Sequence, residues 1–287
     1  MPIAPLNSHA QDIDNMNGTG YGWREKLIKP WINDVLASAF LVAMASTLYF
    51  SQARRLSLSM DGFLLTFLMQ SGDLQAFNLH EVKEPGCPFL GLAWHLAALL
   101  TGGTATGYNA FMFLCIAISA LLVYILIRTL LPSQPVWAFL AGALKIVWCA
   151  NYEVFDNSGL AIYFAEALFW LALWLFTVLA LRRDGMSSFE VCLGCVVMAC
   201  CLLVSVGTYQ TSWPVFILAP PSLIWLGAKR KSHTWRETTI WYVATLSMMA
   251  WSIYVSRNYA ASLAPTSNVI TSRLFLPAYG RVPSSRF

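Results

Sequence analysis

The sequence predicts an all-α polytopic membrane protein with about seven transmembrane helices, and three observations lead to this fold class. Hydrophobic residues make up 57% of the 287 positions and charged residues only 11%, whereas soluble domains are roughly 45–50% apolar and about 25% charged. Several apolar runs have the ~20 residues that a helix needs to cross a bilayer core. Aromatic residues reach 14%, with 12 Trp, and such residues are typical of the two membrane interfaces.

Seven apolar runs are predicted to cross the membrane. One of them, Ser212–Gly227, contains three prolines, which a span tolerates where neighbouring helices satisfy the carbonyl groups that proline leaves free. An eighth run, Pro88–Thr101, is short, contains His95 and ends at a glycine pair. The six other spans are Asn33–Gln52, Asn109–Leu131, Pro135–Ala150, Gly159–Leu181, Phe189–Val206 and Thr238–Val255.

The basic residues decide whether Pro88–Thr101 crosses the membrane. If it does not cross, every short basic loop lies on the same side as the basic N-terminal flank, and the positive-inside rule makes this side cytoplasmic. If it crosses, most later basic residues move to the other side. We therefore expect Pro88–Thr101 to be an amphipathic helix in the outer interface. The basic residues of the N-terminal flank and of these short loops are Arg24, Lys26, Lys29, Arg128, Arg182, Arg183, Lys229, Arg230, Lys231 and Arg236.

This topology divides the chain into three parts. Residues 1–30 are a cytoplasmic tail, which we expect to be partly disordered because Asn, Gly, Ser and Asp are abundant there. Residues 31–255 form the transmembrane domain, including a long first outer loop at residues 53–108. Within that loop, Met60–Met69 is a second candidate membrane-lying helix, and structured loops of this length are usually functional. Residues 256–287 are an outer C-terminal segment.

Two kinds of site are disfavoured by the sequence. No basic run is interleaved with aromatic residues in a soluble segment, so we expect no nucleic-acid partner. All cysteines except Cys87 fall in apolar stretches, and the pair Cys192 and Cys195 has no His or carboxylate beside it. We interpret them as packing residues rather than metal ligands. His80 and His95 also lack a second ligand at metal spacing.

The order of elements resembles a known family. The first predicted span is followed by an outer loop with an early acid, Asp61 in LSLSMDGFLLTFL, and then by an apolar helix and a small polar stretch leading to Asn109. Further on, VSVGTYQTSWPVFILA contains a Tyr-Gln element. Over Asn33 to Gly227, these features resemble the GT-C superfamily of integral membrane glycosyltransferases, in particular its O-antigen glucosyltransferases and protein mannosyltransferases.

The resemblance implies a reaction and a location. GT-C enzymes take a sugar from a polyprenyl-phosphate donor and pass it to a glycan, lipid or protein acceptor on the non-cytoplasmic side. The implied location is an integral membrane protein with a cytoplasmic N-terminus, in a bacterial inner membrane rather than the endoplasmic reticulum. The chemistry needs a carboxylate that activates the acceptor hydroxyl or orders a divalent cation, Mg²⁺ or Mn²⁺, beside the phosphate.

Three acids are candidates for this catalytic role. Asp61 stands where the resemblance places the catalytic acid, and it could instead cap the helix that follows it. Glu153 and Asp156 lie on the second outer loop, and one of them is the candidate second acid. Asp156 could instead cap the helix that begins near Gly159, whereas Glu153 has no such structural explanation and no motif.

Four residues are candidates for substrate binding. Arg54 and Arg55 follow the first span at its outer end, where guanidinium groups hold phosphate or reach lipid headgroups. Tyr209 and Gln210 stand at an outer span end, where they could hydrogen-bond to sugar hydroxyls. A Tyr at this level is also an ordinary interface residue.

Two charged residues lie deep within predicted spans. Lys145 and Glu166 each sit about 10–13 Å below the outer end of a helix, at 1.5 Å rise per residue. They could therefore meet across an antiparallel helix pair. Charges at this depth usually have a function; we interpret these as a structural ion pair, with a proton or ion relay as the alternative.

Two other functions stay open at this point. A small multispan transporter or flippase would place Lys145 and Glu166 at its centre and would commonly show internal repeats, of which the sequence gives no clear sign. A non-catalytic fragment of a glycosyltransferase would explain why Gly62 follows Asp61, where the family usually has a second acid. The short chain favours the same interpretation.

Overall fold

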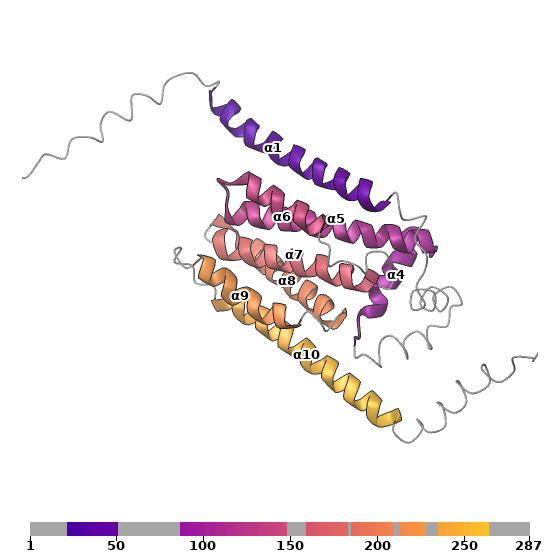
Figure 1. The fold of residues 1–287 in the computed structure, drawn as a ribbon. Helices are drawn as coiled ribbons and strands as arrows, with labels where there is room; N and C mark the ends of the chain where they lie inside the picture. Colours follow the sequence, from indigo (N-terminus) through magenta and orange to yellow (C-terminus); the bar gives the residue numbers. More distant parts are fainter. Residues whose placement is uncertain are drawn as a thin grey trace, which may run out of the picture.

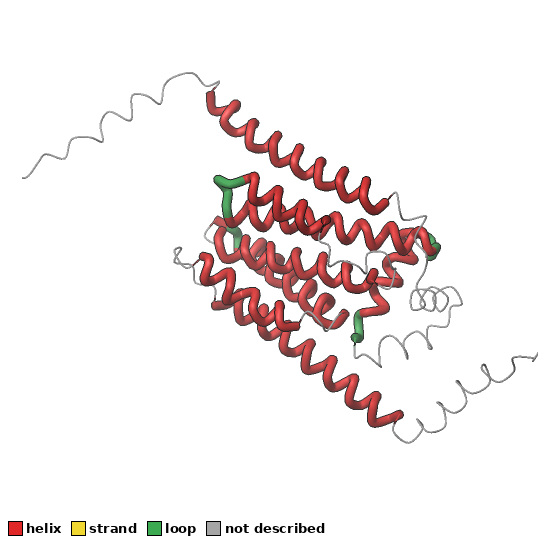
Figure 2. The backbone as a smooth tube through the Cα atoms, viewed as in Figure 1, coloured by secondary structure: helices red, strands yellow, loops and turns green. Residues whose placement is uncertain are grey.

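A computed structural model describes residues 22–50, 87–147, 159–182, 185–208, 213–227 and 235–263. Over these residues the chain is helical apart from short turns, and no strand is present (Figures 1 and 2). The all-α class is therefore confirmed for this part of the chain. The elements are α1 (Gly22–Ala45), the π-helix η2 (Ser46–Phe50), α4 (Leu90–Thr101), α5 (Ala105–Leu130), α6 (Pro135–Val147), α7 (Leu160–Arg182), α8 (Ser188–Thr208), α9 (Trp213–Gly227) and α10 (Trp235–Leu263).

Most of these bounds lie within a few residues of the predicted spans, and two differ more. Helix α1 begins at Gly22, inside the segment 1–30 that the sequence assigned to a tail. Helix α10 continues to Leu263, past the expected span end at Val255. A helix does not have to stop where its apolar pattern stops, and the next strong helix-breaking residue is Pro265.

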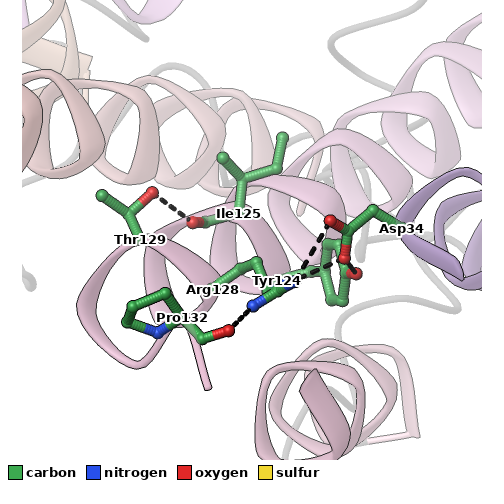
Figure 3. A network of polar contacts seen from close by, with 6 residues as sticks. All are labelled: Asp34, Tyr124, Ile125, Arg128, Thr129 and Pro132. Carbon is green, nitrogen blue, oxygen red and sulfur yellow. Dashed lines mark hydrogen bonds and ion pairs between the residues drawn. The ribbon is translucent and has the colours of Figure 1, made fainter. Parts of the chain in front are cut away.

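Helix α1 runs antiparallel to α5. Near the end of α5, the Arg128 Nε donates to Asp34 of α1 over 2.9 Å, as Figure 3 shows. Near the start of α5, the ring of Phe113 stacks on Tyr49, with centroids 5.4 Å apart. We call the two ends of the bundle the Arg128 end and, opposite it, the α4 end.

The helices from α6 to α10 alternate in direction between these two ends (Figure 1). Helix α6 returns beside α5, and the Tyr49 hydroxyl donates to the carbonyl of Ile146 near its end. Between α8 and α7, the Ser205 hydroxyl donates to the Ala165 carbonyl over 2.5 Å. Between α10 and α9, the Trp241 indole donates to the Phe216 carbonyl over 2.8 Å. Interhelical bonds of this kind are typical of membrane helix bundles.

Helix α4 lies across the end of the bundle rather than along it (Figure 1). The ring of Trp94 packs on Tyr108 of α5 at 4.9 Å, and the Phe89 backbone N–H donates to the Gly207 carbonyl of α8 over 3.1 Å. At 12 residues the helix is about 18 Å long, too short for a hydrocarbon core of ~30 Å. Length does not separate α4 from the predicted spans, since α6 has only 13 described residues. The direction of α4 across the bundle is what distinguishes it. Its exposed face is largely apolar, with Leu99 81% exposed, so it is less amphipathic than expected.

Three helices in the described part of the chain are long and apolar enough to cross a membrane: Ala105–Leu130, Leu160–Leu181 and Ser188–Thr208. The outside of the bundle is also apolar. Phe189 is 74% exposed and Trp235 80% exposed, and so much large apolar surface is unfavourable in water. These helices and this surface indicate a membrane protein.

Candidate functional site

An ion pair inside the bundle joins Lys145 and Glu166. Lys145 lies in the last turn of α6, and its Nζ is 2.9 Å from Oε2 of Glu166 on α7. The pairing that the sequence suggested is therefore confirmed. The side chains are only 11% and 28% exposed, respectively, so water screens this pair weakly.

Two aromatic residues of α7 complete the surroundings of the ion pair. Tyr163 and Trp170 stand three residues before and four residues after Glu166, and this spacing places all three on one face of the helix. The Lys145 Nζ lies 5.7 Å from the centroid of the Tyr163 ring, and the Trp170 indole donates to Glu166 Oε1 over 3.2 Å. The sequence analysis missed both aromatic residues, although their spacing from Glu166 was a usable signal.

These contacts determine what the site can do. One oxygen of Glu166 faces the ammonium group and the other accepts from the Trp170 indole. The charge is therefore compensated and hydrogen-bonded, which is what makes an ion pair tolerable away from water. The pair links α6 to α7, and both of these helices also pack against α5. The geometry is that of a structural ion pair.

The seven residues that the sequence selected for catalysis and substrate binding lie outside the described residues. The ends of the helices that flank their segments are described, however. Residues 51–86 connect η2 to α4, residues 148–158 connect α6 to α7, and residues 209–212 connect α8 to α9. Each of these six flanking ends is the one nearer the α4 end of the bundle, although α6 stops part-way along α5 (Figure 1). The seven residues are Arg54, Arg55, Asp61, Glu153, Asp156, Tyr209 and Gln210.

The basic segments attach to the opposite end. Arg128 lies in the last turn of α5, and α7 ends at Arg182. The segment after Arg182 leads to α8 through a capping box, in which the Ser187 N–H donates to the Glu190 carboxylate over 2.7 Å and Ser187 Oγ accepts from the Glu190 N–H over 3.2 Å. The basic segment 228–234 connects the ends of α9 and α10 at the same end of the bundle (Figure 1).

Within the described part of the chain, no three His, Cys, Asp or Glu residues come together as a metal site. Comparison with protein-family models, curated proteins and solved structures gave no match. The function is therefore inferred from the residues and from the arrangement of the helices.

Proposed function

We propose that this chain is an integral membrane glycosyltransferase of the GT-C kind. It has seven spans and a cytoplasmic N-terminus, and its α4 end faces the non-cytoplasmic side. There it transfers a sugar from a polyprenyl-phosphate donor to a glycan, lipid or protein acceptor. Helices α1, α5, α6, α7, α8, α9 and α10 are the proposed spans.

One observation supports this proposal above the others. Every segment that carries a candidate acid or a candidate substrate-binding residue connects the helix ends nearer the α4 end (Figure 1). The short basic segments connect at the Arg128 end, as the positive-inside rule predicts for a cytoplasmic side, whereas Arg54, Arg55 and Lys83 lie in the long segment at the α4 end. A reaction on a lipid phosphate needs its acids, its phosphate-binding groups and a membrane interface on the same side.

The proposed reaction is a displacement at the anomeric carbon of the donor sugar. Asp61 accepts the proton of the acceptor hydroxyl, and the acceptor oxygen forms the new glycosidic bond. The bond between the anomeric carbon and the phosphate oxygen breaks, and polyprenyl phosphate leaves with the electron pair. Arg54 or Arg55 holds the phosphate through charge-assisted hydrogen bonds.

The test uses the full chain in lipid vesicles with labelled polyprenyl-phosphate glucose or mannose and an extract of envelope glycans. Transfer is measured as label in the glycan fraction. General-base catalysis is worth roughly 10²–10⁴-fold, so Asp61→Asn should lower transfer by about that factor. Asp73→Asn is the matched control, because it removes a carboxylate from the same segment and should leave transfer unchanged. Equal transfer by both variants would remove Asp61 as the base, and no transfer by the wild type from either donor would contradict the proposal.

The Lys145–Glu166 pair favours a second candidate, a small transporter or flippase, because intramembrane charges often mark transport paths. The same vesicles distinguish the two. A flippase moves labelled polyprenyl-phosphate sugar between leaflets without attaching label to the glycan, and neutralising both residues of the pair abolishes that movement. A glycosyltransferase attaches the label, and Lys145 and Glu166 affect its stability alone.

A further inference from the structure

A groove opens between α1 and α5 at the Arg128 end, and nothing in the proposed reaction uses it. Its volume is about 560 Å³, and it is open to the surface. It combines an ion pair with hydroxyl groups and apolar side chains. Its lining residues are Asp34, Val35, Ser38, Tyr124, Ile125, Arg128, Thr129 and Pro132.

A polar network forms the floor of the groove, and it has hydrogen-bonding groups left for a ligand (Figure 3). Asp34 Oδ1 accepts from the Tyr124 hydroxyl over 2.6 Å and from Arg128 Nε over 2.9 Å. Asp34 Oδ2 has a single long contact, 3.4 Å from Arg128 Nη2, so it can accept a further bond. Arg128 Nη1 donates to the Pro132 carbonyl, and the guanidinium still carries more N–H groups than these contacts use. The groove thus offers an acceptor beside a donor.

The position of this network matches the headgroup layer of a membrane. Helix α5 has 26 residues and is therefore about 39 Å long. This length exceeds the ~30 Å hydrocarbon core and approaches the ~40–45 Å that includes the headgroups. Arg128, in the last turn, consequently lies at headgroup depth when α5 crosses the bilayer. The apolar walls of the groove, Val35 and Ile125, are 47% and 38% exposed and are available to an acyl chain.

We infer that this groove binds a phospholipid with a zwitterionic, primary-ammonium headgroup, such as phosphatidylethanolamine. The ammonium donates to Asp34 Oδ2, the phosphate accepts from a free N–H of Arg128, and the first part of an acyl chain lies against Val35 and Ile125. A carboxylate and a guanidinium side by side complement a headgroup that carries one charge of each sign. This binding is independent of any glycosyl transfer at the other end of the bundle.

The same chemistry predicts selection among lipids. A trimethylammonium headgroup, as in phosphatidylcholine, has no N–H to donate to Asp34. An anionic headgroup, as in phosphatidylglycerol, places no cation beside that carboxylate. Since one charge-assisted hydrogen bond is lost in each case, we expect at least about tenfold weaker retention of these two lipids.

The test measures lipid retention by the full chain. The protein is placed in nanodiscs of equal phosphatidylethanolamine, phosphatidylcholine and phosphatidylglycerol content, and native mass spectrometry then counts the lipids that stay bound. Ser38→Leu fills the groove without touching the ion pair and should abolish selective retention. Ala39→Leu adds a side chain of the same size at an exposed position on the same helix and should retain it. Asp34→Asn should remove the preference for phosphatidylethanolamine over phosphatidylcholine.

Two results would overturn this assignment. The first is selective phosphatidylethanolamine retention that Ser38→Leu leaves intact, because the lipid then binds elsewhere. The second is equal retention of the three lipids or a preference for phosphatidylglycerol, because the ammonium then plays no part. If Asp34→Asn fails to fold, the comparison of Ser38→Leu with Ala39→Leu still decides the question.

Discussion

Two ion pairs in the described part of the chain each join side chains from different helices. Arg128 of α5 pairs with Asp34 of α1, and Lys145 of α6 pairs with Glu166 of α7. Such pairs add little net stability when they replace apolar packing, but they are costly to break because one charge stays behind without compensation. The two pairs therefore act mainly by fixing which helices lie side by side.

A double-mutant cycle on Lys145 and Glu166 tests this account. Lys145→Met alone leaves a poorly solvated carboxylate and should lower the free energy of unfolding by about 3–5 kcal/mol. Lys145→Met with Glu166→Leu removes both charges and should restore much of that loss. Circular dichroism during thermal unfolding in mild detergent measures the stability of both variants. A double variant as unstable as the single one would show that the pair is not a coupled unit.

The two ion pairs also differ in how far the sequence could predict them. Lys145 and Glu166 were predicted to meet because they are the clear charges deep inside consecutive spans at similar depths. Asp34 and Arg128 also lie in consecutive predicted spans, but they are separated by 94 residues, including residues 53–108, which connect the two spans. A connection of this length does not force the two helices to lie side by side, so this network needed the packed structure.

At the scale of helices, close packing depends on a few glycines. A Cβ atom on Gly142 of α6 would lie 2.9 Å from Leu41 and 3.0 Å from the Ala120 carbonyl. A Cβ atom on Gly207 of α8 would lie 2.7 Å from the Phe89 ring and 2.8 Å from Met248. Small residues of this kind let membrane helices approach closely. Gly207 in particular lets the start of α4 and Met248 of α10 each approach α8 closely.

Two glycines of the same helix give a matched comparison. Gly207→Ala should cost about 1–3 kcal/mol of unfolding free energy, because the new methyl group meets both Phe89 and Met248. Gly194→Ala should be neutral or stabilise by roughly 0.5–1 kcal/mol through helix propensity, since its nearest neighbour is the flexible end of Leu179 at 3.1 Å. Thermal unfolding of both variants measures this difference. If Gly207→Ala were as stable as Gly194→Ala, α4 would not be docked as described.

The helices themselves were largely predictable from the sequence. Hydropathy located α5, α7 and α8 to within about four residues. The basic residues set Pro88–Thr101 apart from the predicted spans, and its place in the outer interface stays a prediction. The packing of α4 across the ends of α5, α7 and α8 was not predictable, because it depends on shape, on Trp94 and on Gly207, rather than on period or charge. The candidate active-site residues stay predictions, since all seven lie outside the described residues.

For the molecule as a whole, the two ends of the bundle carry different chemistry. The candidate acids belong to segments that connect at the α4 end, and the basic residues of the short connecting segments lie at the Arg128 end (Figure 1). Arg54 and Arg55 are basic residues of the α4 end. The glycosyltransferase proposal requires the first end to face the non-cytoplasmic side. The lipid site requires the second end to lie at the opposite interface. Both proposals therefore require α5 to cross the bilayer, and the glycosyltransferase proposal also requires this orientation.

The orientation is tested most directly by labelling single cysteines in the full chain, after its seven native cysteines are replaced. Ser71→Cys, Ser158→Cys and Ser212→Cys report on the α4 end, and Ser133→Cys and Ser232→Cys report on the Arg128 end. With a membrane-impermeant maleimide on intact cells, the first three variants should be labelled, and the last two should be labelled only after the cells are opened. Labelling of Ser71→Cys and Ser133→Cys from the same side would contradict the account.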